Sequence, residues 1–66
     1  MTNRAIVFTI RAEDAYGRIR IETKHSSYSK YNTTASSKRH VFDKINHIAD
    51  QMNNEEGMAV VFEVEG

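Results

Sequence analysis

Residues 36–54 constrain the fold of this chain more than any other stretch, because they alone show a clear helical period. Their apolar side chains recur at steps of three and four, as on one face of an α-helix; they are Val41, Phe42, Ile45, Ile48, Ala49 and Met52. Ser36 or Ser37 is expected to cap the start of the helix, and Gly57 to end it in a left-handed conformation. The rest of the chain must supply a surface for this apolar stripe.

Three other segments have the sequence pattern of β-strands. Residues 4–11 carry β-branched and aromatic side chains on both faces, which predicts a strand in the middle of a sheet. Residues 18–23 and 58–65 alternate between two faces, one of them apolar, as strands with one solvated face do. The turn signals over residues 12–17 predict that the first two strands form a hairpin.

This order of elements predicts a single small α+β domain with the arrangement β-β-α-β. The helix is expected to carry the chain back, so that the third strand runs parallel to the second. With the first strand in the middle, the result is a three-stranded antiparallel sheet of order 2-1-3, with the amphipathic helix packed on one face. That face is expected to carry Ile6, Phe8, Ile10, Ile19, Ile21, Val60, Phe62 and Val64. We expect Phe8, Ile45 and Phe62 to form the centre of the core.

Residues 24–35 are rich in Ser, Thr and Asn and have no apolar periodicity. We expect a mobile polar loop there, because little apolar surface is available to offset the entropy lost on ordering. A loop of about twelve residues is long for a compact domain, and such loops tend to be functional or disordered.

The charges are segregated along the chain, although the formal net charge is zero. Between residues 17 and 42 the only acid is Glu22, and after Asp43 the only base is Lys44. The middle segment therefore offers candidate contacts for phosphates and unpaired bases: Arg18, Arg20, Lys24, His25, Tyr28, Lys30, Tyr31, Lys38 and Arg39. The competing interpretation, a solvated loop whose tyrosines pack locally, is favoured because nucleic-acid-binding domains are usually clearly basic.

The sequence shows no recognisable arrangement for catalysis or for cofactor binding. His40 and His47 share a helix face but lie roughly 10 Å apart along its axis. One metal ion holds its histidine ligands at about 2 Å, so these two cannot meet it unaided. The serines near His25 lack the orienting acid and strained turn of a nucleophilic triad, and Glu55 and Glu56 lack a dry cleft. We therefore predict no catalytic residue, no metal site and no cofactor.

Self-association is expected, because a chain of about 60 residues buries only about 60% of its unfolded surface. The chain also has no cysteine that could stabilise it by a disulfide. We predict a homodimer that joins the open faces of two sheets, with Val7 and Val61 at its centre. The alternative, edge-to-edge pairing between unlike strands, would tend to propagate instead of closing.

The leading functional interpretation is a small non-catalytic accessory protein that binds or regulates a macromolecular partner, a protein of unknown identity. The alternative is a nucleic-acid-binding accessory protein that uses the basic middle segment. Lack of cysteine, of a signal-peptide pattern and of an apolar run near 20 residues predicts a cytoplasmic location and no membrane insertion.

Overall fold

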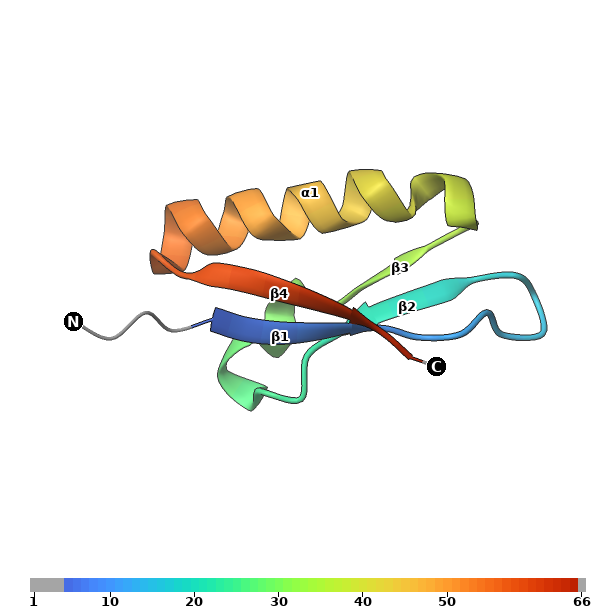
Figure 1. Ribbon diagram of the computed structural model, residues 1–66, viewed down its shortest axis with the longest axis horizontal. Helices are drawn as coiled ribbons and strands as arrows, with labels where there is room; N and C mark the ends of the chain where they lie inside the picture. Colours follow the sequence, from blue (N-terminus) through green and yellow to red (C-terminus); the bar gives the residue numbers. More distant parts are fainter. Residues whose placement is uncertain (1–4, 66) are drawn as a thin grey trace.

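The computed structural model describes residues 5–65 and contains one four-stranded sheet with a single main helix on one side of it (Figure 1). The strands are β1 (Ala5–Ile10), β2 (Ile19–Glu22), β3 (Thr33–Ala35) and β4 (Ala59–Val64). The helical elements are the 3-10 helices η1 (Ser26–Tyr31) and η2 (Lys38–His40), α1 (Val41–Gln51) and the π-helical turn η3 (Met52–Glu56). The predicted α+β class is confirmed. The predicted start of the first strand at Arg4 lies outside the described residues.

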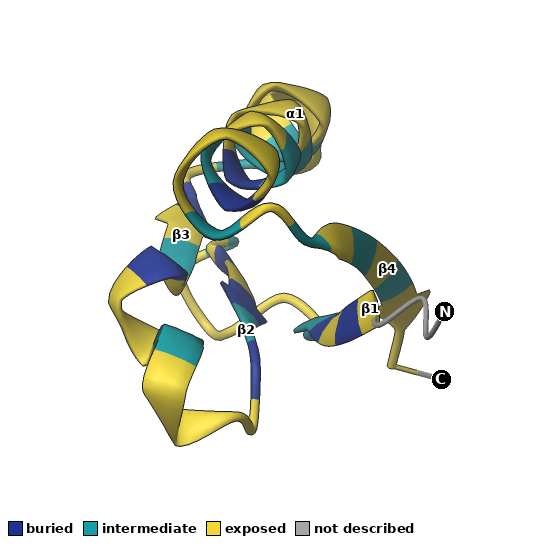
Figure 2. Ribbon diagram, turned by 90° about the vertical axis from the view of Figure 1, so that its left-hand side faces the viewer, coloured by how far each residue is buried: buried dark blue, intermediate teal, exposed yellow. Residues whose placement is uncertain are grey.

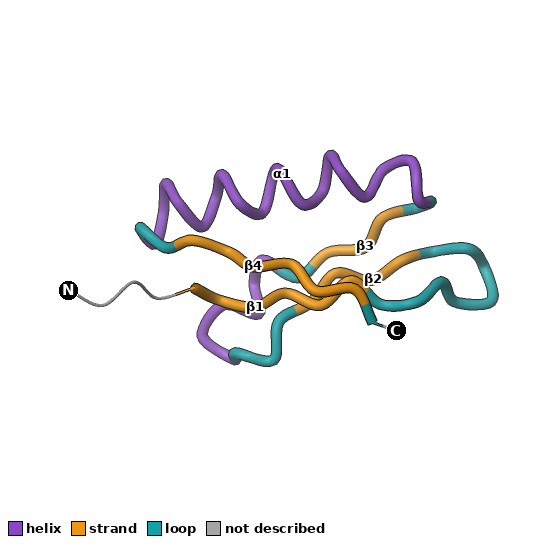
Figure 3. Tube along the Cα trace, viewed as in Figure 1, coloured by secondary structure: helices purple, strands orange, loops and turns teal. Residues whose placement is uncertain are grey.

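The sheet has the strand order β3-β2-β1-β4. In Figure 3 its strands all lie below α1. β2 is antiparallel to both of its neighbours, whereas β1 and β4 are parallel. The predicted position of the first strand, between the second and the last, is correct. The prediction of three antiparallel strands is wrong, because β3 reverses the chain once more before α1 begins. The helix therefore returns the chain into a strand that runs with β1.

The polar segment 24–35 is not the loop that its composition predicts, since it contains both η1 and β3. Tyr31 is 5% exposed and belongs to the core, and Ala35 is fully buried opposite Ile19 of β2. The side-chain oxygen of Asn32 accepts a hydrogen bond from the Thr23 N–H at 2.8 Å, which closes the base of the segment. The segment is thus anchored to the rest of the structure by two buried side chains, although its sequence has no apolar periodicity. The mobility of this segment stays a prediction.

The core lies between α1 and the sheet, and its largest fully buried side chains are Phe8, Ile21, Ile48 and Met52. Figure 2 shows the buried positions on the facing sides of helix and sheet. Phe8 is central, as predicted. Ile45 and Phe62 are only partly buried and pack against this cluster from outside. Ile48 of α1 and Met52 of η3 lie at the centre of the core instead.

Phe42 was predicted to face the sheet, but it is 73% exposed. The reason lies in the helical period. Val41, Ile45, Ile48 and Met52 follow one another at steps of four, three and four, and stay on one narrow stripe. Phe42 is turned by about 100° from Val41, which places it beside that stripe.

The two ends of the helical segment differ in how far the sequence predicts them. Ser37 precedes η2 without a side-chain capping hydrogen bond, so the predicted serine cap is wrong there. Its carbonyl oxygen accepts the His40 N–H at 3.1 Å instead, and α1 begins only at Val41. Gly57 has φ +67°, which confirms the predicted left-handed end.

Two helix substitutions test this account of the core. Ile48→Ala is expected to lower the free energy of unfolding by about 2–5 kcal/mol. The Ile48 side chain is 1% exposed, so its removal leaves a cavity in the core. Phe42→Ala removes a larger side chain from the same helix and is the matched control. It is expected to cost far less, since surface changes usually stay within about 0.5 kcal/mol. Denaturant unfolding measures both, and equal losses would contradict the packing described here.

Candidate interaction surfaces

An apolar groove of about 630 Å³ lies between the first turns of α1 and the ends of β1 and β4. Its larger apolar lining residues are Ile10, Ile19, Val41, Phe42, Ile45 and Val64. Phe42 and Val64 are 73% and 77% exposed, and both are among the large apolar side chains that face solvent. The groove therefore presents apolar side chains to solvent that the core does not cover.

Charged side chains at the rim of the groove occur in pairs of opposite sign. Arg11 follows β1 and reaches Glu22 at 2.9 Å and Glu65 at 2.7 Å, which ties the central strand to both of its neighbours. On the other side, Lys38 lies 3.4 Å from Glu13. These pairs give the rim both signs of charge and leave the centre apolar.

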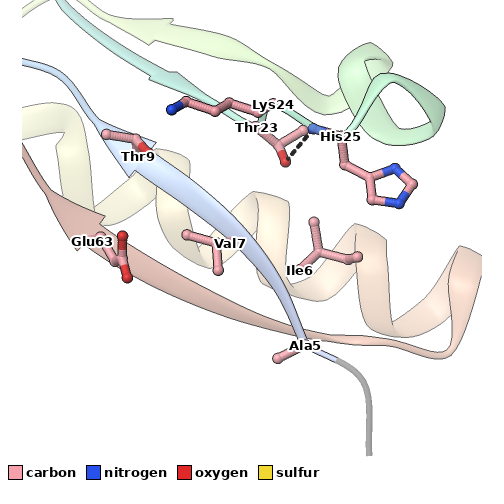
Figure 4. Close-up of a pocket in the computed structure, with 8 residues that line it drawn as sticks. All are labelled: Ala5, Ile6, Val7, Thr9, Thr23, Lys24, His25 and Glu63. Atoms are coloured by element: carbon pink, nitrogen blue, oxygen red, sulfur yellow. Dashed lines mark hydrogen bonds between the residues drawn. The ribbon is translucent and has the colours of Figure 1, made fainter.

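A second, smaller cavity of about 440 Å³ lies on the open face of the sheet (Figure 4). Val7 and Thr9 of β1, Glu63 of β4, and the residues after β2 line it. Figure 4 shows Lys24 and His25 pointing to opposite sides, so the polar groups do not converge on one point. We therefore regard the apolar groove as the stronger candidate.

The open face also carries Val7 and Val61, the residues predicted to form the centre of a dimer. They are register partners on β1 and β4, and they are 41% and 44% exposed. Both are accessible, as a face-to-face dimer requires.

The predicted nucleic-acid contacts are distributed over the molecule, and several of them lie beside acids. Arg18 pairs with Asp14 at 3.1 Å in the β1–β2 turn, and Lys30 of η1 lies 3.6 Å from Glu56. The ion pair of Lys38 lies at the groove. Glu56 belongs to the acidic tail and lies beside Lys30 of the basic segment, so separation of charge along the chain is not fully kept in space.

The remaining predicted contacts occupy different places. Arg20 and Arg39 are exposed on β2 and η2, and Lys24 and His25 border the open-face cavity. The Tyr28 ring packs against the His25 ring at a centroid distance of 4.8 Å. The structure thus brings His25 and Tyr28 together, and it places Arg18, Lys30 and Lys38 beside acidic side chains.

Tyr31 anchors η1 to the core instead of offering a stacking surface. Its hydroxyl lies 3.0 Å from Glu55 Oε1 and 2.8 Å from Glu56 Oε2, to which it donates. Burial and these two carboxylates raise the pKa of Tyr31 well above its usual range, since both disfavour the phenolate. The link joins η1 to the turn that follows α1.

Among residues 5–65, no group of three or more His, Cys, Asp or Glu side chains is placed to hold a metal ion. Within the same residues, no helix is both long and apolar enough to cross a membrane. Comparisons of the chain with models of protein families, with curated protein sequences and with solved structures find no match. Its function has to be argued from its surfaces.

The groove was not predicted from the sequence. The sequence feature that could have indicated it is that Phe42 lies beside the narrow apolar stripe that includes Val41 and Ile45. Alternation along β4 assigns Val64 to the helix side of the sheet, but it does not reveal that the strand ends beyond the covered core.

The alkaline pH dependence of stability tests the environment of Tyr31. Because its pKa is raised in the folded protein, the unfolded chain ionises first, at about pH 10. The stability that depends on the neutral phenol is complete below that pH and falls as the pH rises further. Between about pH 9.5 and 11.5, a range that includes the usual tyrosine pKa of about 10, the Tyr31→Phe variant is expected to lose less stability than the parent protein. Parallel curves for both proteins from thermal unfolding would contradict this assignment.

Proposed function

We propose that this chain is a small non-catalytic interaction protein, and that its apolar groove binds an apolar segment of a protein partner. The observation that carries the proposal is the exposure of Phe42 and Val64 in one groove. Fully burying an aromatic or aliphatic side chain of this size contributes about 1.5–3 kcal/mol. Aromatic side chains are also enriched among the residues that dominate binding energy at protein interfaces.

The chemistry of the groove favours an amphipathic segment as the occupant. Its centre takes apolar side chains, and its rim offers Lys38 and Arg11 beside Glu13 and Glu65. Such a rim orients a partner that carries both charges, and it does not select strongly for a polyanion.

Nucleic-acid binding has less support. The ion pairs of Arg18, Lys30 and Lys38 reduce the positive potential that phosphates require, and Tyr31 is not available for stacking. No catalytic role is proposed, because the groove centre is apolar and titratable side chains lie only at its rim. The cytoplasmic location stays a prediction from the sequence.

Selection of peptides from a random display library against the immobilised protein tests the proposal. We expect selected peptides to share two or more apolar anchors, and Phe42→Ser to weaken their binding at least about tenfold. Tyr16→Ser is the matched control, because Tyr16 is also a strongly exposed aromatic residue but lies in the β1–β2 turn. It is expected to leave binding unchanged.

Two outcomes would contradict the proposal. Selected peptides that bind the Phe42→Ser variant as tightly as the parent protein would place recognition outside the groove. Retention on immobilised single-stranded DNA or RNA that falls steeply with salt and is insensitive to Phe42→Ser would favour the nucleic-acid alternative.

A further inference from the structure

Within the described part of the chain, β4 is an edge strand of six residues, Ala59–Val64, that pairs with β1. Figure 2 shows it at the outer side of the sheet, away from β2 and β3. The other edge, β3, has only three residues. β4 is therefore the longer edge, and an edge strand exposes backbone groups that are able to pair with another strand.

The backbone groups of β4 that face outward follow from a single hydrogen bond. The Glu65 N–H donates to the Ile10 carbonyl oxygen at 2.9 Å, so Glu65 directs its backbone groups toward β1. Successive residues of a strand point these groups to opposite sides. The N–H and C=O groups of Val60, Phe62 and Val64 therefore point away from β1, toward the free edge.

We propose that this edge binds β4 of a second copy of the chain, antiparallel and about a two-fold axis, so that one sheet runs through both copies. The proposal goes beyond the groove and does not depend on it. Pairing of a strand with its own copy is isologous and closes at two subunits. The objection to pairing between unlike edges, that it propagates, does not apply here.

The sequence of β4 is compatible with itself in a specific register. With Val61 opposite Val61 of the second copy at the axis, Val60 lies opposite Phe62, and both direct their backbone groups at each other. On the helix side of the sheet every directly opposed pair is then apolar, because Met58 lies opposite Val64. Such cross-strand apolar pairs stabilise an antiparallel ladder.

The acidic residues of β4 support the same register. Glu63 lies opposite Ala59 of the second copy, and Glu65 lies beyond the end of β4, so no glutamate of the paired strands faces another. Glu65 is also held by Arg11 of its own chain at 2.7 Å. A register shifted by two residues would place Phe62 at the axis and bring the two Glu63 side chains into diagonal contact, where like charges repel. A foreign strand would lack these matched constraints, so a second copy is the occupant that the sequence fits.

Val61 and Val7 distinguish this dimer from the face-to-face dimer predicted from the sequence. Both valines lie on the open face, in register and almost equally exposed. A face-to-face dimer buries both. An edge dimer places Val61 at the axis and leaves Val7 one strand away from it.

Cysteine cross-linking tests the register, because the chain has no native cysteine. The Val61 pair at the axis is a non-hydrogen-bonded pair with Cα atoms about 4.5 Å apart, within disulfide range. Val61→Cys is expected to form a covalent dimer under mild oxidation, and Val7→Cys is the matched control that does not. A covalent dimer from Val7→Cys at the same rate would overturn the proposed interface.

Sedimentation at several concentrations tests the dimer itself. Val61→Lys and Val64→Pro are each expected to weaken it at least about tenfold, whereas Val7→Lys leaves it unchanged. Val64→Pro removes an outward N–H without breaking a hydrogen bond to β1, and far-UV circular dichroism checks that the fold is kept. A monomeric parent protein at every concentration would overturn the proposal, as would a dimer that resists both edge variants. Phe42→Ser is expected to leave the dimer intact, so failure of the groove proposal and failure of this one are distinguishable.

Discussion

The contact of Ile48 and Met52 with Phe8 and Ile21 is the constraint on which the rest of this structure depends. Both helix residues lie in the second half of the helical segment, and Tyr31 of η1 closes the core beside them. Among residues 5–65, no buried side chain as large as Tyr31 closes the other end. There β3 contributes the small side chain of Ala35 opposite Ile19, and Ile19 lines the apolar groove. The groove exists because the helical segment packs tightly on the core at its C-terminal end, whereas apolar side chains at its N-terminal end are only partly covered.

The fold could be predicted from the sequence wherever apolar residues repeat with a regular period. The periods of α1, β1, β2 and β4 predict these elements and the helix-covered face of the sheet. β3 has three residues, Thr33–Ala35, which are too few to establish alternation. Missing this strand in the prediction had a large effect. The reversal at β3 makes the last strand parallel to β1, whereas the prediction made it antiparallel.

The candidate sites could be predicted less well than the fold, for two physical reasons. Charges separated in sequence come together in space, as Lys30 and Glu56 do, so a basic segment does not imply a basic surface. Exposure at the end of an amphipathic stripe depends on a turn of about 100° between neighbouring helix residues, and sequence period alone does not fix where the covering surface ends. Phe42 and Val41 differ by that single step. Val7 and Val61 were placed correctly on the open face because strand alternation is a simpler rule.

The two proposed surfaces meet at Val64. Its side chain lines the apolar groove, and its backbone groups belong to the outward-facing set on β4. In the proposed register, Met58 of the second copy lies opposite Val64 and brings an apolar side chain to the open end of the groove. A partner in the groove and a second copy on the edge would then contact the same residue. Binding at two sites that share a residue is coupled, and the coupling free energy is the same in both directions. A partner segment that packs against Met58 of the second copy would bind the dimer more tightly, and one that displaces it would favour the monomer.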